Sequence, residues 1–288
     1  MVDGILTNMN EYKYDLAVAY RIYPKMSAHL PSVFSDNKLK LAELCLKSFK
    51  ASLGNLRVKI WVLLDNCPAA YEAMFARLWL PKDLVFQRYP GVGDAATFRE
   101  QSRILMEQTD AEYIYLAEDD YFYLPGQFAQ SVSFLKQNPD AHFVSPYDHP
   151  DIYATELHAL PREARTIGEK QWNSCFSTTH TMLTTRQTLR ESKAVFLRSY
   201  GKVSPDLSKW MALTKRHVFN PLVFMRWAFT NQFWAGSIFY AWRFCWRQIL
   251  FGKKYTLWIP HPAIATHMVA GMEAPGINWQ QEFAKCSL

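Results

Sequence analysis

Three consecutive acidic residues, Glu118, Asp119 and Asp120, stand directly after an apolar run. Adjacent carboxylates repel one another, so an unpartnered cluster at the end of a buried strand costs stability. A divalent cation would convert this repulsion into affinity, and oxygen ligands suit Mg²⁺ and Mn²⁺, which commonly bridge to substrate phosphates. A solvated acidic turn without a ligand is the alternative, because short acidic motifs also occur by chance.

Two apolar runs earlier in the chain also lead into polar residues, Arg21 after the first and Asp65 after the second. The segment 91–95, Gly-Val-Gly-Asp-Ala, follows a third run and precedes a predicted helix. Its glycines could let backbone N–H groups approach a phosphate, and a tight turn with Asp94 as the helix cap is the alternative.

The elements that must position these residues can be predicted from short apolar runs and helical spacing. We predict strands over 15–24, 58–65, 84–90 and 111–118, and helices over 36–55, 69–80 and 93–109, with Asp36 capping the first helix. Strands that alternate with helices indicate an α/β fold with a mostly parallel central sheet flanked by helices. Because ligands bind at the carboxyl ends of such strands, we expect Arg21, Asp65 and the acidic triplet to meet at one edge.

The second half of the sequence is less regular. It predicts strands over 141–148 and 175–186, a helix over 187–200, a helix beginning near Asp206, and a strand or extended segment over 255–268. We also expect Trp172 and His180 to line a pocket, since aromatic faces can stack on the C–H groups of a ligand.

Charge is distributed unevenly along the chain. The net charge is +6, yet residues 207–272 contain eight Lys and Arg and no Asp or Glu, so the remainder carries 6 − 8 = −2. Six of the ten Trp lie in the same stretch, which favours contact with anionic lipid headgroups. A tryptophan-rich helical core with a basic solvated rim is the alternative. Polar residues interrupt the apolar segment 218–242, so we expect it to lie on a surface rather than to span a membrane.

The number and spacing of the cysteines indicate the cellular compartment that we expect for the protein. The five cysteines are scattered, and their odd count and spacing give neither a disulfide framework nor a zinc motif. The first residues lack the basic-then-apolar pattern of a signal peptide. We therefore expect a cytoplasmic protein that could associate peripherally with the inner face of a membrane.

The segment 116–126, LAEDDYFYLPG, together with the order of strands, resembles the GT-A fold of nucleotide-sugar-dependent glycosyltransferases. It is similar to the DxD motif of that family in its EDD form. The resemblance implies a GT-A (Rossmann-like) sheet with an aromatic-rich, basic, mainly helical C-terminal part. It also implies Mn²⁺ or Mg²⁺, a UDP-, GDP- or TDP-sugar donor and a glycan or lipid-linked acceptor, and no nucleic-acid partner. Residues 1–150 would bind the donor and residues 151–288 the acceptor, within one continuous domain.

The same resemblance implies roles for individual residues. Asp120 would bind the metal, joined by His267 or, less well placed, by His261, although a lone histidine is more often structural. Glu118 and Asp119 would contact the ribose or the donor sugar. The remaining donor contacts implied by the resemblance are Tyr20, Arg21, Ile22 and Asp65 around the nucleobase, and Asp94 and Arg99 at the helix start.

An inverting transferase also needs a carboxylate to accept the proton of the acceptor hydroxyl. The candidates are Asp206, close to Trp210 in sequence, and Asp148 or Asp151. An ordinary helix cap is the alternative for Asp206.

Two other functions remain as alternatives. A sugar-1-phosphate nucleotidyltransferase would share the α/β layout and the metal, but it would carry a glycine-rich loop after the first strand, where residues 20–32 contain no glycine. A non-catalytic membrane-surface module would use only the basic, tryptophan-rich half.

Overall fold

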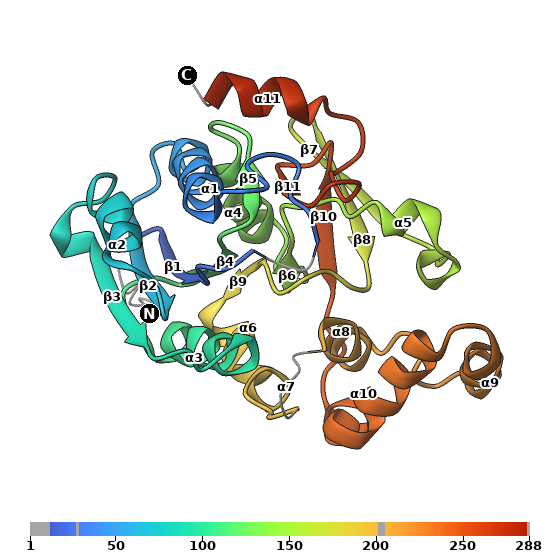
Figure 1. Cartoon of the computed structure of the whole chain (residues 1–288). Helices are drawn as coiled ribbons and strands as arrows, with labels where there is room; N and C mark the ends of the chain where they lie inside the picture. The colour runs from blue at the N-terminus through green and yellow to red at the C-terminus, as the bar shows by residue number, and fades with distance from the viewer. Residues whose placement is uncertain (1–11, 27–28, 201–204, 287–288) are drawn as a thin grey trace, which may run out of the picture.

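A nine-stranded mixed sheet forms the centre of the structure, a computed structural model that describes residues 12–26, 29–200 and 205–286 (Figure 1). The strand order is β3-β2-β1-β4-β9-β6-β10-β8-β7, and β8 and β9 run opposite to the others. The strands are β1 (Leu16–Ile22), β2 (Val58–Asp65), β3 (Leu84–Tyr89), β4 (Tyr113–Glu118), β6 (Phe143–Val144), β7 (Ala164–Ile167), β8 (Lys170–Cys175), β9 (Met182–Thr185) and β10 (Leu257–His261).

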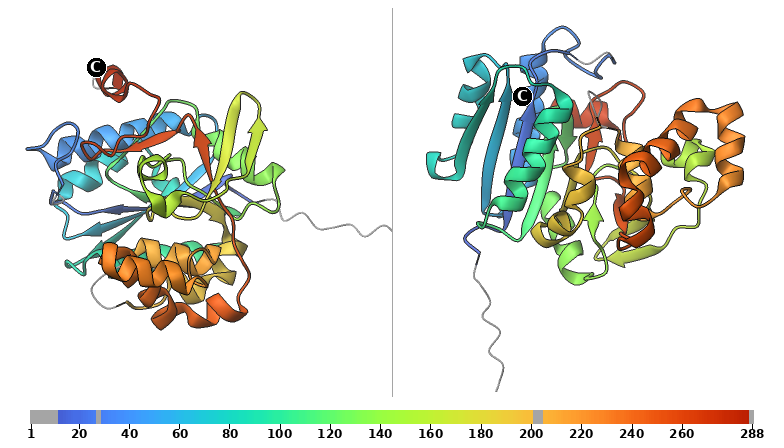
Figure 2. Two further views of the ribbon diagram at one scale, coloured as in Figure 1. Left: turned by 90° about the vertical axis from the view of Figure 1, so that its right-hand side faces the viewer. Right: turned by 90° about the horizontal axis from the view of Figure 1, so that it is seen from below.

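Helices cover both faces of this sheet, as Figure 2 shows from two further sides. One face carries α1 (Lys38–Ser52), α2 (Ala69–Ala76), α4 (Phe128–Gln137) and α11 (Trp279–Cys286). The other carries α3 (Asp94–Glu107), α6 (Arg186–Glu191), α7 (Lys193–Phe196), α8 (Asp206–Thr214) and α10 (Gln232–Phe251). The short α5 (Asp151–Ala154) and α9 (Pro221–Thr230) lie toward the outside.

Strand β1 explains why the first apolar run is continuous. Leu16, Val18 and Tyr20 pack with α1 and α2, whereas Ala17 and Ala19 pack with α3 on the opposite face. A strand covered on both faces loses the alternation of polar and apolar residues. The parallel block of β1 to β4 with its helices confirms the predicted α/β fold class.

The later strands and helices differ from the predicted boundaries. The predicted strand 175–186 is divided: it contains the last residue of β8, a connecting loop and then β9. Of the predicted strand 141–148, only β6 is paired in the sheet, and it ends shortly before Pro146, which has no N–H to donate. The predicted helix 187–200 divides at Ser192, whose hydroxyl donates to the Thr188 and Leu189 carbonyls.

Both predicted caps of the N-terminal half were wrong. Asn37 rather than Asp36 caps α1, because its side-chain oxygen accepts a hydrogen bond from the Lys40 N–H at 3.0 Å. At α3 the cap position is Gly93, whose φ of 86° favours glycine. Asp94 is the first helical residue, and its carboxylate pairs with Arg21 instead.

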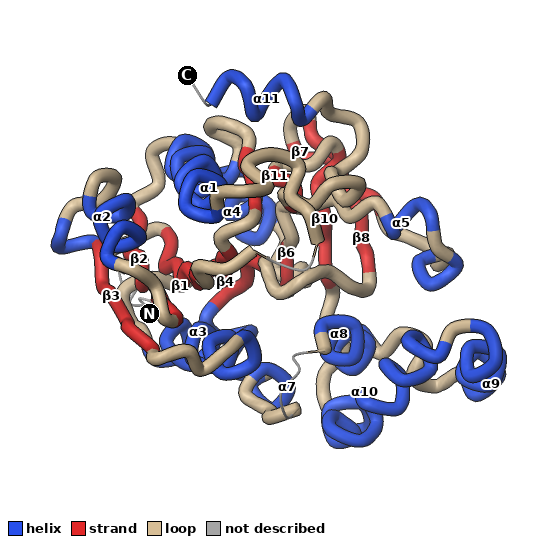
Figure 3. The backbone as a smooth tube through the Cα atoms, viewed as in Figure 1, coloured by secondary structure: helices blue, strands red, loops and turns tan. Residues whose placement is uncertain are grey.

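A second, two-stranded sheet brings the C-terminal part to the acidic triplet. Strand β5 (Tyr121–Tyr123) pairs with β11 (Ala265–His267), and Tyr121 is the partner of His267 in this register. The Met268 N–H donates to the Asp120 carbonyl at 2.8 Å. Figure 3 shows these short strands among the loops above the main sheet. This sheet therefore holds His267 beside Asp120.

The tryptophan-rich stretch forms helices α8 to α10 and strand β10. Trp210, Trp227 and Trp258 are buried, as the core alternative predicts, whereas Trp246 is 44% exposed. Across the parts of the chain that the structure describes, none of the helices combines the length and the apolarity that crossing a bilayer requires.

Candidate functional site

A cavity of about 420 Å³ opens at the carboxyl ends of β1, β2 and β4. It lies where the sequence predicted that the strand ends would meet. Its lining residues are Arg21, Ile22, Tyr23, Lys25, Met26, Lys38, Asp65, Gly93, Asp94, Thr97, Glu118, Asp119 and Asp120.

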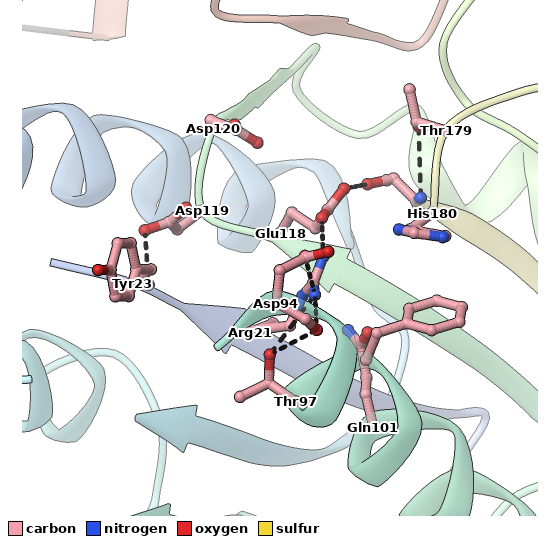
Figure 4. Close-up of polar contacts among 12 residues, drawn as sticks. Arg21, Tyr23, Asp94, Thr97, Gln101, Glu118, Asp119, Asp120, Thr179 and His180 are labelled. Atoms are coloured by element: carbon pink, nitrogen blue, oxygen red, sulfur yellow. Dashed lines mark hydrogen bonds and ion pairs between the residues drawn. The ribbon is translucent and has the colours of Figure 1, made fainter. Parts of the chain in front are cut away.

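The carboxylates of the triplet point in different directions and have different partners (Figure 4). Glu118 pairs with the buried guanidinium of Arg21 and accepts a hydrogen bond from the Thr181 hydroxyl at 2.8 Å. Arg21 also pairs with Asp94. Burial alone would lower the pKa of Arg21, but the charges of Glu118 and Asp94 raise it above its usual range. Both oxygens of Glu118 are thus occupied, and this ion-pair network forms one wall of the cavity.

Asp119 is held by a cation on α1. The Lys38 ammonium lies 3.0 Å from Asp119 Oδ1, and the Tyr23 N–H donates to Oδ2 at 3.4 Å. Burial raises the pKa of Asp119 to about 6, the charge of Lys38 opposes this, and the neighbouring Asp120 adds to it. Lys38 and Asp119 thus form an ion pair in the lining of the cavity, in which each charge compensates the other.

Asp120 is the member of the triplet that keeps an oxygen available. Its Oδ2 lies 3.2 Å from His267 Nε2, while its Oδ1 is buried and has no hydrogen-bond partner among the described residues. Burial would raise the pKa of Asp120, but His267 and then Lys38 and Arg21 outweigh it and hold the pKa near 2. The His267 ring stacks on Tyr121 at 4.8 Å between centroids.

The donor set of Asp120 and His267 fits a divalent cation. One carboxylate oxygen without a partner and one imidazole nitrogen supply the mixed shell that suits Mn²⁺, and the remaining positions would be left for phosphate oxygens and water. The sequence-predicted ligands are therefore adjacent. His261, the other candidate, instead has its Nδ1 2.9 Å from Asp148 Oδ2, which accepts the hydrogen bond.

A second group could hold a metal ion. Ligand atoms of Asp94, Glu118 and His180 lie within 4.8 Å of one another. The Arg21 guanidinium, however, already pairs with both of these carboxylates. A cation placed there would be repelled by Arg21, so the geometry favours Asp120 and His267.

Asp65 organises the loop that precedes α3. Its Oδ1 accepts hydrogen bonds from the Gly91 and Val92 N–H groups, and its Oδ2 accepts one from Gly93, each at 2.8 Å. The carboxylate is 2% exposed, so its oxygens are committed to the backbone rather than presented to a nucleobase. Asp65 thereby fixes the glycine turn that forms one rim of the cavity.

Replacing Asp65 by Ala is expected to lower the free energy of unfolding by about 1–3 kcal/mol, because charge-assisted hydrogen bonds to three loop N–H groups are lost. Urea unfolding followed by circular dichroism would measure the change. Asp65→Asn keeps one acceptor oxygen and is expected to lose less. Equal stability of Asp65→Ala and the wild type would contradict this role.

Two other predicted donor contacts lie elsewhere. Tyr20 is fully buried between Phe49 and Phe75 in the core on the α1 side of the sheet. Arg99 is exposed on α3 and is not among the residues that line the cavity. Tyr20 thus supports the sheet beneath the cavity, while Ile22, two residues later on β1, reaches it.

A second cavity has a volume of about 390 Å³. Asp206 is among its lining residues, and Asp206 Oδ1 lies 2.6 Å from His180 Nε2. The same imidazole nitrogen is 2.8 Å from Lys209 Nζ, and its ring stacks on Phe98 at 3.9 Å. Burial lowers the pKa of Lys209 to about 8, against the charge of Asp206. His180 also has a ligand atom within 4.8 Å of one of Asp94, so it lies close to one lining residue of each cavity.

The other candidate bases differ in access. Asp151 lines the second cavity and its side chain is 50% exposed. Asp148 is fully buried, accepts from Tyr153 at 2.8 Å, and lines neither cavity. Trp172 stacks on Phe134 in the core rather than lining a pocket. At the start of α8 the cap position is taken by Pro205 and Asp206 is the first helical residue, so Asp206 is not the N-cap.

Sequence reasoning missed the half-buried Lys38 and the buried Lys209, which lie beside acidic residues of the site. Lys38 is the first residue of α1, where a cation is unfavourable beside the positive end of the helix dipole. A lysine at the start of a predicted helix was therefore the sequence feature that could have indicated a nearby acidic partner for Lys38. Lys209 gave none, because its partner His180 lies 29 residues away in the sequence.

Comparison with known proteins gives structural likeness only. No protein-family model matches the chain, and no curated protein sequence matches it. Similar solved structures include S. aureus TarS 1-349, with 10% identity and a TM-score of 0.43 over 69% of this chain and 55% of that one. They also include the mannosyltransferase PcManGT from Pyrobaculum calidifontis in complex with GDP-Man and Mn²⁺, with 16% identity and a TM-score of 0.34 over 47% of this chain and 36% of that one. The chain thus spans about a third to about half of the length of these proteins.

Proposed function

We propose that the protein is a metal-dependent glycosyltransferase that moves a sugar from a nucleotide-diphosphate sugar to a hydroxyl of a glycan or a lipid-linked acceptor. The observation that carries the proposal is the pairing of Asp120 with His267 at the cavity formed by the strand ends. A buried carboxylate oxygen that has no partner among the described residues, next to an imidazole, is costly unless a ligand satisfies it.

The first cavity would hold the donor. Asp120 and His267 would bind Mn²⁺ or Mg²⁺, which when bound would neutralise the charge of the diphosphate leaving group. Lys25 adds positive charge at the same cavity, where the diphosphate oxygens would lie. The wall built by Arg21 and Glu118 would orient the sugar toward the second cavity.

The second cavity would hold the acceptor. Asp206 is 35% exposed there and would accept the proton of the attacking hydroxyl, which gives inversion at the anomeric carbon. His180 fixes the orientation of this carboxylate and joins it to the donor side. In this arrangement residues 1–150 supply the donor side except for His267, which the second part contributes, and Asp206 belongs to the acceptor side. One continuous sheet contains strands from both parts.

A screen of UDP-, GDP- and TDP-sugars tests this function, with released nucleoside diphosphate and thermal stabilisation as readouts, each with Mn²⁺ and with a chelator. We expect one class of donor to stabilise the protein only when the metal is present. The absence of metal-dependent stabilisation and of turnover with every donor would refute the proposal. A sugar-1-phosphate nucleotidyltransferase would instead release pyrophosphate from a nucleoside triphosphate.

A further inference from the structure

Helices α9 and α10 expose an unusual set of large apolar side chains. On α9, Leu222, Met225 and Phe229 are 79%, 53% and 84% exposed. On α10 the exposed residues are Phe233, Phe239, Tyr240, Trp246, Leu250 and Phe251. We call these nine side chains, with the neighbouring Arg243 and Arg247, the α9–α10 face. Aromatic residues in such numbers on a surface mark an interaction site.

The exposed residues of α10 form a single side of the helix. Cys245 has non-helical backbone angles and divides α10 into two helical stretches. At 100° per residue, the outward positions fall within about 120° before Cys245 and within about 140° after it. The opposite side carries Ala235, Ile238, Ala241, Cys245 and Ile249, all buried against the body of the protein. The helix is therefore apolar on both sides, and arginines are inserted only in the outward one.

The charges of this face have one sign. Residues 207–272 contain eight Lys and Arg and no acid. Within the described part of the chain, neither Arg243 nor Arg247 has a carboxylate partner, and each guanidinium instead lies over a ring, Phe244 and Trp246 respectively. Two acids from elsewhere in the chain pair with nearby basic residues, Glu156 with Arg226 of α9 and Glu191 with Lys253 after α10.

This charge pattern argues against a second copy of the chain as the occupant. A two-fold interface places the same patch against itself, so Arg243 and Arg247 would face their own copies without any acid from residues 207–272 to compensate them. An anionic bilayer, in contrast, offers phosphates to the arginines and an apolar boundary to Phe, Trp and Leu at the same depth.

We propose that the α9–α10 face docks the protein on an anionic membrane surface, with its aromatic and aliphatic side chains in the interface and its arginines among the headgroup phosphates. Phe233 belongs both to this face and to the lining of the second cavity. Docking would therefore place the mouth of that cavity at the lipid surface. The binding itself does not depend on the proposed transferase activity.

Co-sedimentation with vesicles tests the docking, using phosphatidylcholine alone and an equal mixture of phosphatidylcholine and phosphatidylglycerol. We expect binding to the mixed vesicles that weakens as salt is raised. The variant Arg243→Glu/Arg247→Glu should bind at least about 20-fold more weakly, because each basic residue near an anionic surface contributes about fivefold. Trp246→Ala/Phe251→Ala should also weaken binding while leaving the charge unchanged.

Lys40→Glu/Lys47→Glu is the matched control, since it makes the same change of charge on exposed lysines of α1, on the opposite side of the sheet. It should bind mixed vesicles nearly as well as the wild type. An equal loss of vesicle binding in both charge variants would contradict docking through the α9–α10 face. The absence of binding to mixed vesicles, or equal binding to mixed and neutral vesicles, would also overturn the proposal. Light scattering that shows a dimer disrupted by Trp246→Ala/Phe251→Ala would overturn the proposal in favour of self-association.

Discussion

Asp120→Asn is expected to reduce sugar transfer by about 10²–10³-fold, the scale on which removal of one charge stabiliser slows an enzyme. The substitution keeps the size of the side chain but removes the charge and one oxygen acceptor. Asp120 is the member of the triplet with a buried oxygen that has no described partner, so this oxygen is the one available to a metal. Released nucleoside diphosphate would report the rate, and calorimetric titration with Mn²⁺ would report the loss of metal binding.

Asp110→Asn is the matched control, because Asp110 stands before the amino end of β4, at the edge opposite the cavity. It should keep both turnover and Mn²⁺ affinity. His267→Ala should weaken Mn²⁺ binding while leaving Asp120 in place. Metal-stimulated turnover at the wild-type rate in Asp120→Asn would exclude Asp120 as a ligand, and it would return the choice to the group around Asp94 and His180.

The position of the site could be predicted from the sequence because it depends on local patterns. Continuous apolar runs that alternate with helical spacing require parallel strands, and the carboxyl ends of parallel strands share one edge. Arg21, Asp65 and the acidic triplet therefore had to lie together, and the structure places all of them around one cavity.

The individual roles could not be predicted because they depend on tertiary partners. Asp65 and Glu118 look as available in the sequence as Asp120, but the loop at 91–93 occupies the first and Arg21 with Thr181 occupies the second. The availability of a carboxylate is set by which donors the fold brings to it. A single sequence does not encode that property locally.

The C-terminal half shows the same limit more strongly. Its strands join the sheet out of sequence order, with β9 between β4 and β6, so the loop lengths do not reveal which residues meet. Asp206 and His180 are in contact although they belong to separate elements. Asp148 is fully buried, so it is not accessible as a base. Residue type alone could not separate these carboxylates.

Asp206→Asn is expected to lower kcat by about 10²–10⁴-fold, the usual contribution of a positioned general base, while the affinity for donor and Mn²⁺ remains. The amide keeps the volume and can still contact His180, so the orientation of the side chain should persist. Asp206 lines the second cavity rather than the first, which is why donor binding should not change. Initial rates at saturating donor and acceptor would measure kcat, and titration with donor in the presence of Mn²⁺ would measure affinity.

Asp151→Asn and Asp148→Asn complete this test, because they separate the three carboxylates by their surroundings. Asp151→Asn changes an exposed residue of the same cavity and should alter kcat little, which makes it the matched control. Asp148→Asn removes the charge that holds His261 and Tyr153, so it should lower stability before it affects chemistry. If Asp151→Asn abolished turnover while Asp206→Asn preserved it, the base would be Asp151, and the contact between Asp206 and His180 would serve only to join α8 to the sheet.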